Sequence, residues 1–200
     1  MNLTVFSGTF NPIHLAHLII AETVRTELEV EKILFIPAYY PPHRSISLAF
    51  SEHRLNMVKL AIQDNKNFDL SNIEYKAKGK SYTYSTIKKL YELYPDLTEK
   101  INFIIGTDAF KLIDTWHEAE KLAELVNFIL IKRVESLDID ELFSSVKLTN
   151  FNYKIVKVPL LEISSTYIRG NINSNKSIKY LVPDCVEKYI KENNLYYEDN

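Results

Sequence analysis

The chain has 200 residues, 46% of them hydrophobic, and a formal net charge of −2. We expect one domain over residues 1–200, with a small helical subregion from about 160 to 200. The near-neutral charge excludes a general basic field for nucleic acid, and the lone Cys185 fits a reducing compartment. The N-terminus lacks the pattern of a signal peptide and the longest apolar run is too short to span a bilayer, so we expect a cytoplasmic protein without nucleic-acid or membrane partners.

The beginning of the chain predicts a strand, a tight loop and a helix. An apolar run over residues 2–6 is followed by an apolar stripe at helical spacing over residues 14–28. Gly8 between them can adopt backbone angles closed to other residues and lets a ligand approach the main chain. His14 and His17 share one helix face, beside the N–H groups and partial positive charge of the first turn. This arrangement predicts a phosphate site.

Three other interpretations fit the residues of this segment less well. A single glycine does not make a dinucleotide fingerprint, and a Walker loop would need a Gly-Lys-Ser/Thr ending. The two histidines could instead share a metal ion, with His43 or Asp108 as a third ligand. However, no cysteine lies nearby and no His-Glu-x-x-His pattern is present. We therefore expect no dedicated metal site made by the protein.

The rest of the chain alternates between strand and helix patterns. Predicted strands cover residues 32–36, 68–70, 72–75, 101–105, 126–132 and 153–158. Predicted helices cover residues 51–63 with Ser51 as cap, a segment from the 81–86 Ser/Thr cluster to 93, residues 118–125, and a segment starting at 164–166.

Strand–helix–strand order with a fully apolar second strand predicts a parallel sheet covered on both faces, with a right-handed crossover. The predicted fold class is therefore α/β, a Rossmann-like, doubly wound and mainly parallel sheet with helices on both faces and a small C-terminal helical part. Ligands bind at the carboxyl ends of the strands in such sheets. The Gly8 loop and the proline-rich loop at 37–44 should lie along that edge.

Several polar groups follow strand ends or open helices, and each has a structural alternative. His43 and Arg44 could reach phosphates from the opposite side, or the loop could be a rigid turn. Asp108 after Gly106 could bind ribose or a base, or cap a helix. The 164–166 hydroxyls with Arg169 suit a phosphate clamp, or a capped surface helix.

Residues 8–17, Gly-Thr-Phe-Asn-Pro-Ile-His-Leu-Ala-His, resemble the signature of nucleotidyltransferases that carry a His-x-x-His motif. Ala16 stands where that pattern has glycine. Further segments resemble the nicotinate-nucleotide adenylyltransferase family, in family order along nearly the whole chain: Pro-Pro-His-Arg at 41–44, Ser-Tyr-Thr-x-x-Thr at 81–86, Gly-x-Asp at 106–108 and Ile-Ser-Ser-Thr-x-Ile-Arg at 163–169. Arg44 replaces the family's lysine, which keeps the charge and changes the hydrogen-bonding geometry.

The resemblance implies transfer of the adenylyl group of ATP to nicotinate mononucleotide, giving deamido-NAD and pyrophosphate in NAD biosynthesis. It implies Mg²⁺ as cofactor, coordinated mainly by phosphates and water, and leaves a homo-oligomer open. The alternatives are a related adenylyltransferase acting on nicotinamide mononucleotide or another phosphate acceptor, and a non-catalytic nucleotide-binding module.

The resemblance also implies residue roles. The implied catalytic residues are His14, His17, Arg44 and Arg169. Those implied for ATP binding are Gly8, Thr9, Phe10, His17, Gly106, Asp108, Arg133, Ile163, Ser164, Ser165, Thr166 and Arg169. Those implied for nicotinate mononucleotide are Ser7, Asn11, His43, Arg44, Tyr82, Thr83 and Trp116, with amides at a helix start holding the carboxylate and the indole stacking on the pyridine ring.

Overall fold

The computed structural model describes residues 2–41, 49–132 and 139–197. Within these ranges six strands form one parallel sheet in the order β3-β2-β1-β4-β5-β6. The strands are β1 (Thr4–Gly8), β2 (Ile33–Pro37), β3 (Phe68–Leu70), β4 (Ile101–Gly106), β5 (Val126–Lys132) and β6 (Asn152–Lys157). This order is that of a doubly wound Rossmann-like sheet, so the predicted fold class is confirmed.

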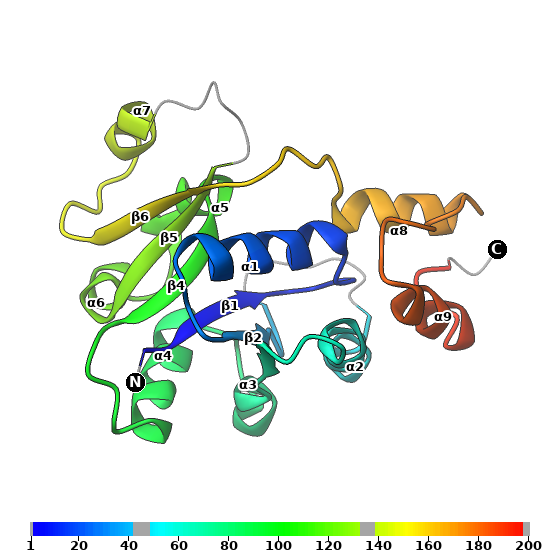
Figure 1. Ribbon diagram of the computed structural model, residues 1–200, viewed down its shortest axis with the longest axis horizontal. Helices are drawn as coiled ribbons and strands as arrows, with labels where there is room; N and C mark the ends of the chain where they lie inside the picture. The colour runs from blue at the N-terminus through cyan, green and yellow to red at the C-terminus, as the bar shows by residue number, and fades with distance from the viewer. Residues whose placement is uncertain (1, 42–48, 133–138, 198–200) are drawn as a thin grey trace.

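Helices cover both faces of the sheet (Figure 1). The first core cluster joins one face to α1 (Leu15–Glu27), α2 (Ser51–Ile62), α8 (Ser165–Asn173) and α9 (Asp184–Glu192). The second joins the other face to α3 (Ile73–Ala77), α4 (Thr83–Leu93), α5 (Thr107–Phe110), the 3₁₀ turn η1 (Ile113–Thr115), α6 (Ala119–Leu125) and α7 (Ile139–Ser144). The alternation of side chains along β1, β2, β4 and β5 supplies both clusters.

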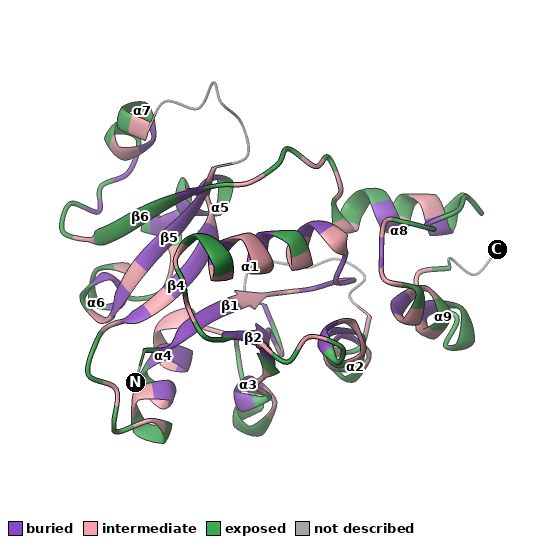
Figure 2. Cartoon of the chain, viewed as in Figure 1, coloured by how far each residue is buried: buried purple, intermediate pink, exposed green. Residues whose placement is uncertain are grey.

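The pattern of burial follows the position of each strand in the sheet. All five residues of β2 are buried, as expected for a strand covered on both sides. In contrast, β6 lies at the edge of the sheet and is exposed except at Val156. Figure 2 shows β6 as a largely green outer strand.

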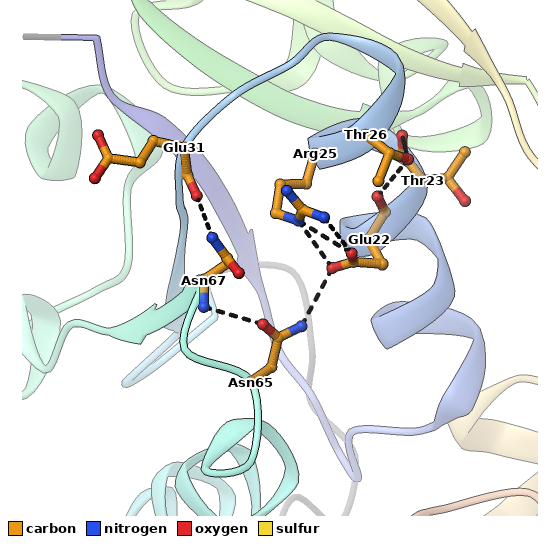
Figure 3. A network of polar contacts seen from close by, with 7 residues as sticks. All are labelled: Glu22, Thr23, Arg25, Thr26, Glu31, Asn65 and Asn67. Atoms are coloured by element: carbon orange, nitrogen blue, oxygen red, sulfur yellow. Dashed lines mark hydrogen bonds and ion pairs between the residues drawn. The ribbon is translucent and has the colours of Figure 1, made fainter.

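A polar network fixes the end of the sheet at which β2 and β3 begin (Figure 3). Arg25 of α1 pairs with Glu22 at 2.6 Å, and the Glu22 carboxylate also accepts a hydrogen bond from Asn65 at 3.2 Å. The Asn65 side chain accepts from the amide of Asn67, whose own side chain donates to the carbonyl of Glu31. Because strands bind ligands at their carboxyl ends, this network has a structural role.

Three local predictions were wrong. Asn72 is the N-cap of α3 and residues 73–75 form its start, since the Asn72 carbonyl accepts hydrogen bonds from the amides three and four residues on, Tyr75 and Lys76. So short an apolar run does not distinguish strand from helix. The first strand extends to Gly8, which pairs with Pro37 and so ends the strand instead of lying in the loop. Phe50, not Ser51, is the N-cap of α2.

Arg54 of α2 is 1% exposed and ties two loops together. Its Nη1 donates to the carbonyls of Thr9 and Ala38, its Nη2 to Tyr39 and its Nε to Ala49. Burial lowers the pKa of Arg54 from its ordinary value, but a guanidinium remains charged. One buried cation thus holds the loop after β1 against both ends of the segment that connects β2 to α2.

We expect Arg54→Met to lower the free energy of unfolding by about 3 kcal/mol, because four backbone carbonyls lose a charged donor. Urea denaturation would measure the loss. The control is Lys59→Met at an exposed position of the same helix, which should change stability by less than about 0.5 kcal/mol. Equal effects of the two substitutions would contradict the role given to Arg54.

Candidate active site

A cavity of about 510 Å³ opens at the carboxyl ends of β1 and β4. These strands are neighbours although β2 follows β1 along the chain, so the direction of strand addition reverses here. That is the topological switch point at which open α/β sheets bind ligands. The walls come from the β1–α1 loop, the β4–α5 junction, the segment after η1, and the starts of α4 and α8.

The β1–α1 loop is tightly built around the ring of Phe10. Phe10 has a φ of 46°, a left-handed conformation that is uncommon for a bulky residue and is imposed by its surroundings. Its ring lies edge-on to Phe6, with centroids 5.6 Å apart. A Cβ atom on Gly8 would come within 3.1 Å of this ring. A larger residue at position 8 would therefore have to displace the Phe10 ring by a few tenths of an ångström.

The two histidines stack on each other at the beginning of α1. Their ring centroids are 3.6 Å apart and their planes 25° apart. His14 is the N-cap and the helix begins at Leu15. The Nδ1 atom of His17 accepts a hydrogen bond from the His14 amide at 3.3 Å, which places the proton of a neutral ring on Nε2. Both imidazoles line the cavity.

The start of α8 is fastened to the same loop. Ser164 is the N-cap, and its hydroxyl accepts from the Tyr167 amide at 3.1 Å. The Ser165 hydroxyl donates to the carbonyl of Pro12 at 2.9 Å. Arg169 donates to the carbonyl of Asn11 at 2.8 Å and lies 3.4 Å from the Thr166 hydroxyl. The predicted hydroxyl and guanidinium cluster thus exists, beside the histidine pair.

Aromatic side chains line another wall of the cavity. Trp116 packs edge-on against Phe103, with centroids 6.2 Å apart. Tyr82 is the N-cap of α4, and the centroid of its ring lies 4.5 Å from that of the His117 ring. Tyr82 makes no side-chain capping bond to the first turn of α4. An amide-rich helix start next to an indole can bind a flat ring that carries an acidic group.

Most of the site residues predicted from the sequence meet in this one cavity. The predicted residues that line it are Ser7, Gly8, Thr9, Phe10, Asn11, His14, His17, Tyr82, Thr83, Gly106, Asp108, Trp116, Ile163, Ser164, Ser165 and Thr166. Arg169 is not among the lining residues and reaches the β1–α1 loop instead. His43, Arg44 and Arg133 lie outside the described residues.

Sequence reasoning gave no site role to three polar residues of the cavity wall, Glu74, Ser81 and His117. Glu74 was assigned to a strand, yet its buried carboxylate accepts from the Tyr39 amide at 3.1 Å and from the Thr86 hydroxyl at 2.7 Å. His117 was given no role, although its position directly after the lone Trp116 was the available signal. In the part of the chain that the structure describes, no group of three or more His, Cys, Asp or Glu residues is arranged to hold a metal ion.

The described helices include none that is long and apolar enough to cross a membrane. The family model for cytidylyltransferase-like proteins matches residues 5–171, and this site on this fold places the chain among the nucleotidyltransferases of that class.

More similar relatives define the family within the class. The probable nicotinate-nucleotide adenylyltransferase of Oceanobacillus iheyensis is 39% identical over 193 residues, covering 96% of this chain and 95% of the relative. That of Desulfitobacterium hafniense strain Y51 is 41% identical over 196 residues, covering 96% and 94%. The chain belongs to the nicotinate-nucleotide adenylyltransferase family.

Solved structures agree with the fold. Nicotinic acid mononucleotide adenylyltransferase of Plasmodium falciparum, solved in complex with NaAD, superposes with a TM-score of 0.80 at 24% sequence identity, covering 98% of this chain and 97% of that one. The same protein in complex with APC gives a TM-score of 0.77 at 23% identity, covering 98% and 96%.

Proposed function

We propose that the cavity binds ATP and nicotinate mononucleotide side by side and joins them. As a nicotinate-nucleotide adenylyltransferase, the protein transfers the adenylyl group of ATP to nicotinate mononucleotide, which yields nicotinate adenine dinucleotide and pyrophosphate in NAD biosynthesis. The observation that carries the site assignment is the meeting of the stacked histidines, the α8 start and the α4 start in one cavity.

The triphosphate of ATP is assigned to the side of the cavity that is rich in hydrogen-bond donors. The start of α1, the imidazoles of His14 and His17, and the hydroxyls and amides that begin α8 all lie there. Helix starts and charge-assisted donors favour anions. Arg169 supports this side through the β1–α1 loop and Thr166, and His43, Arg44 and Arg133 remain predicted contributors from the sequence.

The nicotinate ring is assigned to the wall formed by Tyr82, Thr83 and Trp116. The amides of the first turn of α4 suit a carboxylate, which brings a full negative charge to the positive end of the helix. A carboxamide lacks this charge and would direct N–H donors at N–H donors. Such a mismatch leaves buried groups unpaired and discriminates strongly. We therefore propose a preference for the acid over the amide.

The chemistry requires positioning and charge stabilisation. The attacking 5′-phosphate of the mononucleotide is already a nucleophile, so no general base and no covalent enzyme intermediate are needed. The protein brings two polyanions together and stabilises the charge that develops on the α-phosphate and on the leaving pyrophosphate. His14 and His17 are proposed as donors to these oxygens, from a helix start whose partial positive charge also favours the phosphates.

We propose Mg²⁺ as the metal that accompanies ATP. Among the described residues, the carboxylates of the cavity wall are those of Glu74, which is engaged by Thr86 and Tyr39, and of Asp108 in α5. They do not form a cage, so phosphate oxygens and water would supply most of the ligands, as Mg²⁺ commonly prefers. When bound, the ion would neutralise charge on the triphosphate.

We also propose that residues 1–200 act as one domain, because α8 and α9 share the core of α1 and α2.

Release of pyrophosphate from ATP tests the function directly. The protein should release it with nicotinate mononucleotide, much more slowly with nicotinamide mononucleotide, and not with phosphopantetheine. A protein that binds ATP but releases no pyrophosphate with any acceptor would be a binding module. Faster reaction with the amide would contradict the proposed role of the α4 start.

His17→Ala should lower kcat by about tenfold to hundredfold while the protein stays folded, because one charge-assisted hydrogen bond to the reacting phosphates is lost. The measurement is steady-state kinetics together with a thermal melt. His53→Ala is the matched control, since His53 contacts Tyr189 of α9 and does not line the cavity. A wild-type kcat in His17→Ala would remove the phosphate role of His17.

Trp116→Leu should raise the KM for nicotinate mononucleotide about tenfold and change the KM for ATP little, because aromatic stacking is lost on one substrate alone. Thr83→Val should act in the same direction. Tyr153→Leu on the exposed edge strand β6 serves as the control. If both KM values rise equally in Trp116→Leu, the pyridine ring binds elsewhere.

A further inference from the structure

Asn11 collects hydrogen bonds from three distant parts of the chain. Its side-chain Oδ1 accepts from the Tyr196 hydroxyl at 2.8 Å and from the Ala49 amide at 3.2 Å. Its backbone carbonyl accepts from Nη1 of Arg169 at 2.8 Å. Asn11 is 2% exposed, and along the chain it follows Phe10 and precedes the two histidines. The conformation of the β1–α1 loop is therefore set by donors that lie far from it in sequence.

Tyr196 reaches this loop from beyond the last described helix, α9. Its side chain packs against the first core cluster together with Leu195. Tyr196 has a φ of 68°, a left-handed conformation that a bulky residue adopts only when its surroundings impose it. Burial raises the pKa of the Tyr196 hydroxyl well above its ordinary value, so the hydroxyl keeps its proton and acts as a donor. These features fix the hydroxyl against Oδ1 of Asn11.

We propose that Tyr196 is a positioning residue for the adenylyl transfer: its hydroxyl holds the Asn11 amide so that the β1–α1 loop keeps Arg169 and the α8 start beside His14 and His17. This inference rests on the proposed function, in which the α8 start binds the triphosphate. The carbonyls of Asn11 and Pro12 are the acceptors that fasten α8. A loosened Asn11 would misplace these acceptors, and a misplacement of about 1 Å far from the chemistry can lower a rate substantially.

The position of Tyr196 predicts an unequal effect on the two substrates. The residues that Asn11 supports bind the triphosphate in our assignment. Tyr82, Thr83 and Trp116, on the wall assigned to the nicotinate ring, share no hydrogen bond or ring contact with Tyr196 or Asn11. Loss of the hydroxyl should therefore impair ATP use and leave the pyridine pocket unchanged.

The chain offers a matched control in Tyr189 of α9. Its hydroxyl lies 2.9 Å from Nδ1 of His53 and accepts from the Asn56 side chain at 3.0 Å. Tyr189 therefore ties the same C-terminal region to α2 through a hydroxyl, but it does not reach the β1–α1 loop. Both Tyr→Phe substitutions remove one hydroxyl and leave the ring. A purely structural role for Tyr196 predicts the same behaviour for both variants.

The test compares Tyr196→Phe with Tyr189→Phe in the full chain. Tyr196→Phe should raise the KM for ATP about fivefold, lower kcat about fivefold and leave the KM for nicotinate mononucleotide within about twofold. Tyr189→Phe should leave all three constants within about twofold, with a similar change in Tm. In an Arg169→Lys background the effect of Tyr196→Phe should shrink, since both changes act through the same residue, Asn11.

Two results would overturn the proposal: identical kinetics for the two variants, or a Tyr196→Phe effect confined to Tm. A second measurement separates this failure from failure of the proposed function. Calorimetry with a non-hydrolysable ATP analogue requires no turnover, and Tyr196→Phe should weaken its binding about fivefold relative to Tyr189→Phe. If the wild-type protein makes no dinucleotide, the proposed function fails, and the affinity difference still decides whether Tyr196 positions the triphosphate site.

Discussion

The arrangement of the site depends on hydrogen bonds to the backbone carbonyls of the β1–α1 loop. Those of Thr9, Asn11 and Pro12 accept hydrogen bonds from Arg54, Arg169 and Ser165, which lie on α2 and α8. A loop with an aromatic residue at positive φ is not stable by itself, so these donors define its shape. The same bonds bring the α8 start to the histidines at the start of α1, more than a hundred residues earlier in the chain.

The fold was predictable because its signals are repeated along the chain. The fully apolar β2, the largely apolar β5 and the regular alternation with amphipathic helices identify a parallel, doubly wound sheet, which the strand order confirms. Errors arose where the signal was short or local. The 72–75 segment has too few residues to show a period, and the Ser51 hydroxyl donates to Glu52 instead of capping α2.

The candidate site was predictable to the extent that each contributing segment carries its own pattern. The histidine spacing, the Ser-Ser-Thr cluster and the lone tryptophan stand out in the sequence and meet in the structure. Contacts between segments could not be predicted in this way. Nothing in the sequence around Arg54 shows that its guanidinium binds carbonyls of two loops, and nothing around Tyr196 points to Asn11. Such contacts depend on tertiary packing, which no local pattern encodes.

The central claim is that a cluster of donors, built where the α1 and α8 starts meet, binds the triphosphate and stabilises the departing pyrophosphate. A crystal structure with a non-hydrolysable ATP analogue and nicotinate mononucleotide tests it most directly. The account predicts phosphate oxygens within hydrogen-bonding distance of His17 and of the first turn of α8, with the pyridine ring against Trp116. A triphosphate bound away from both helix starts would contradict it.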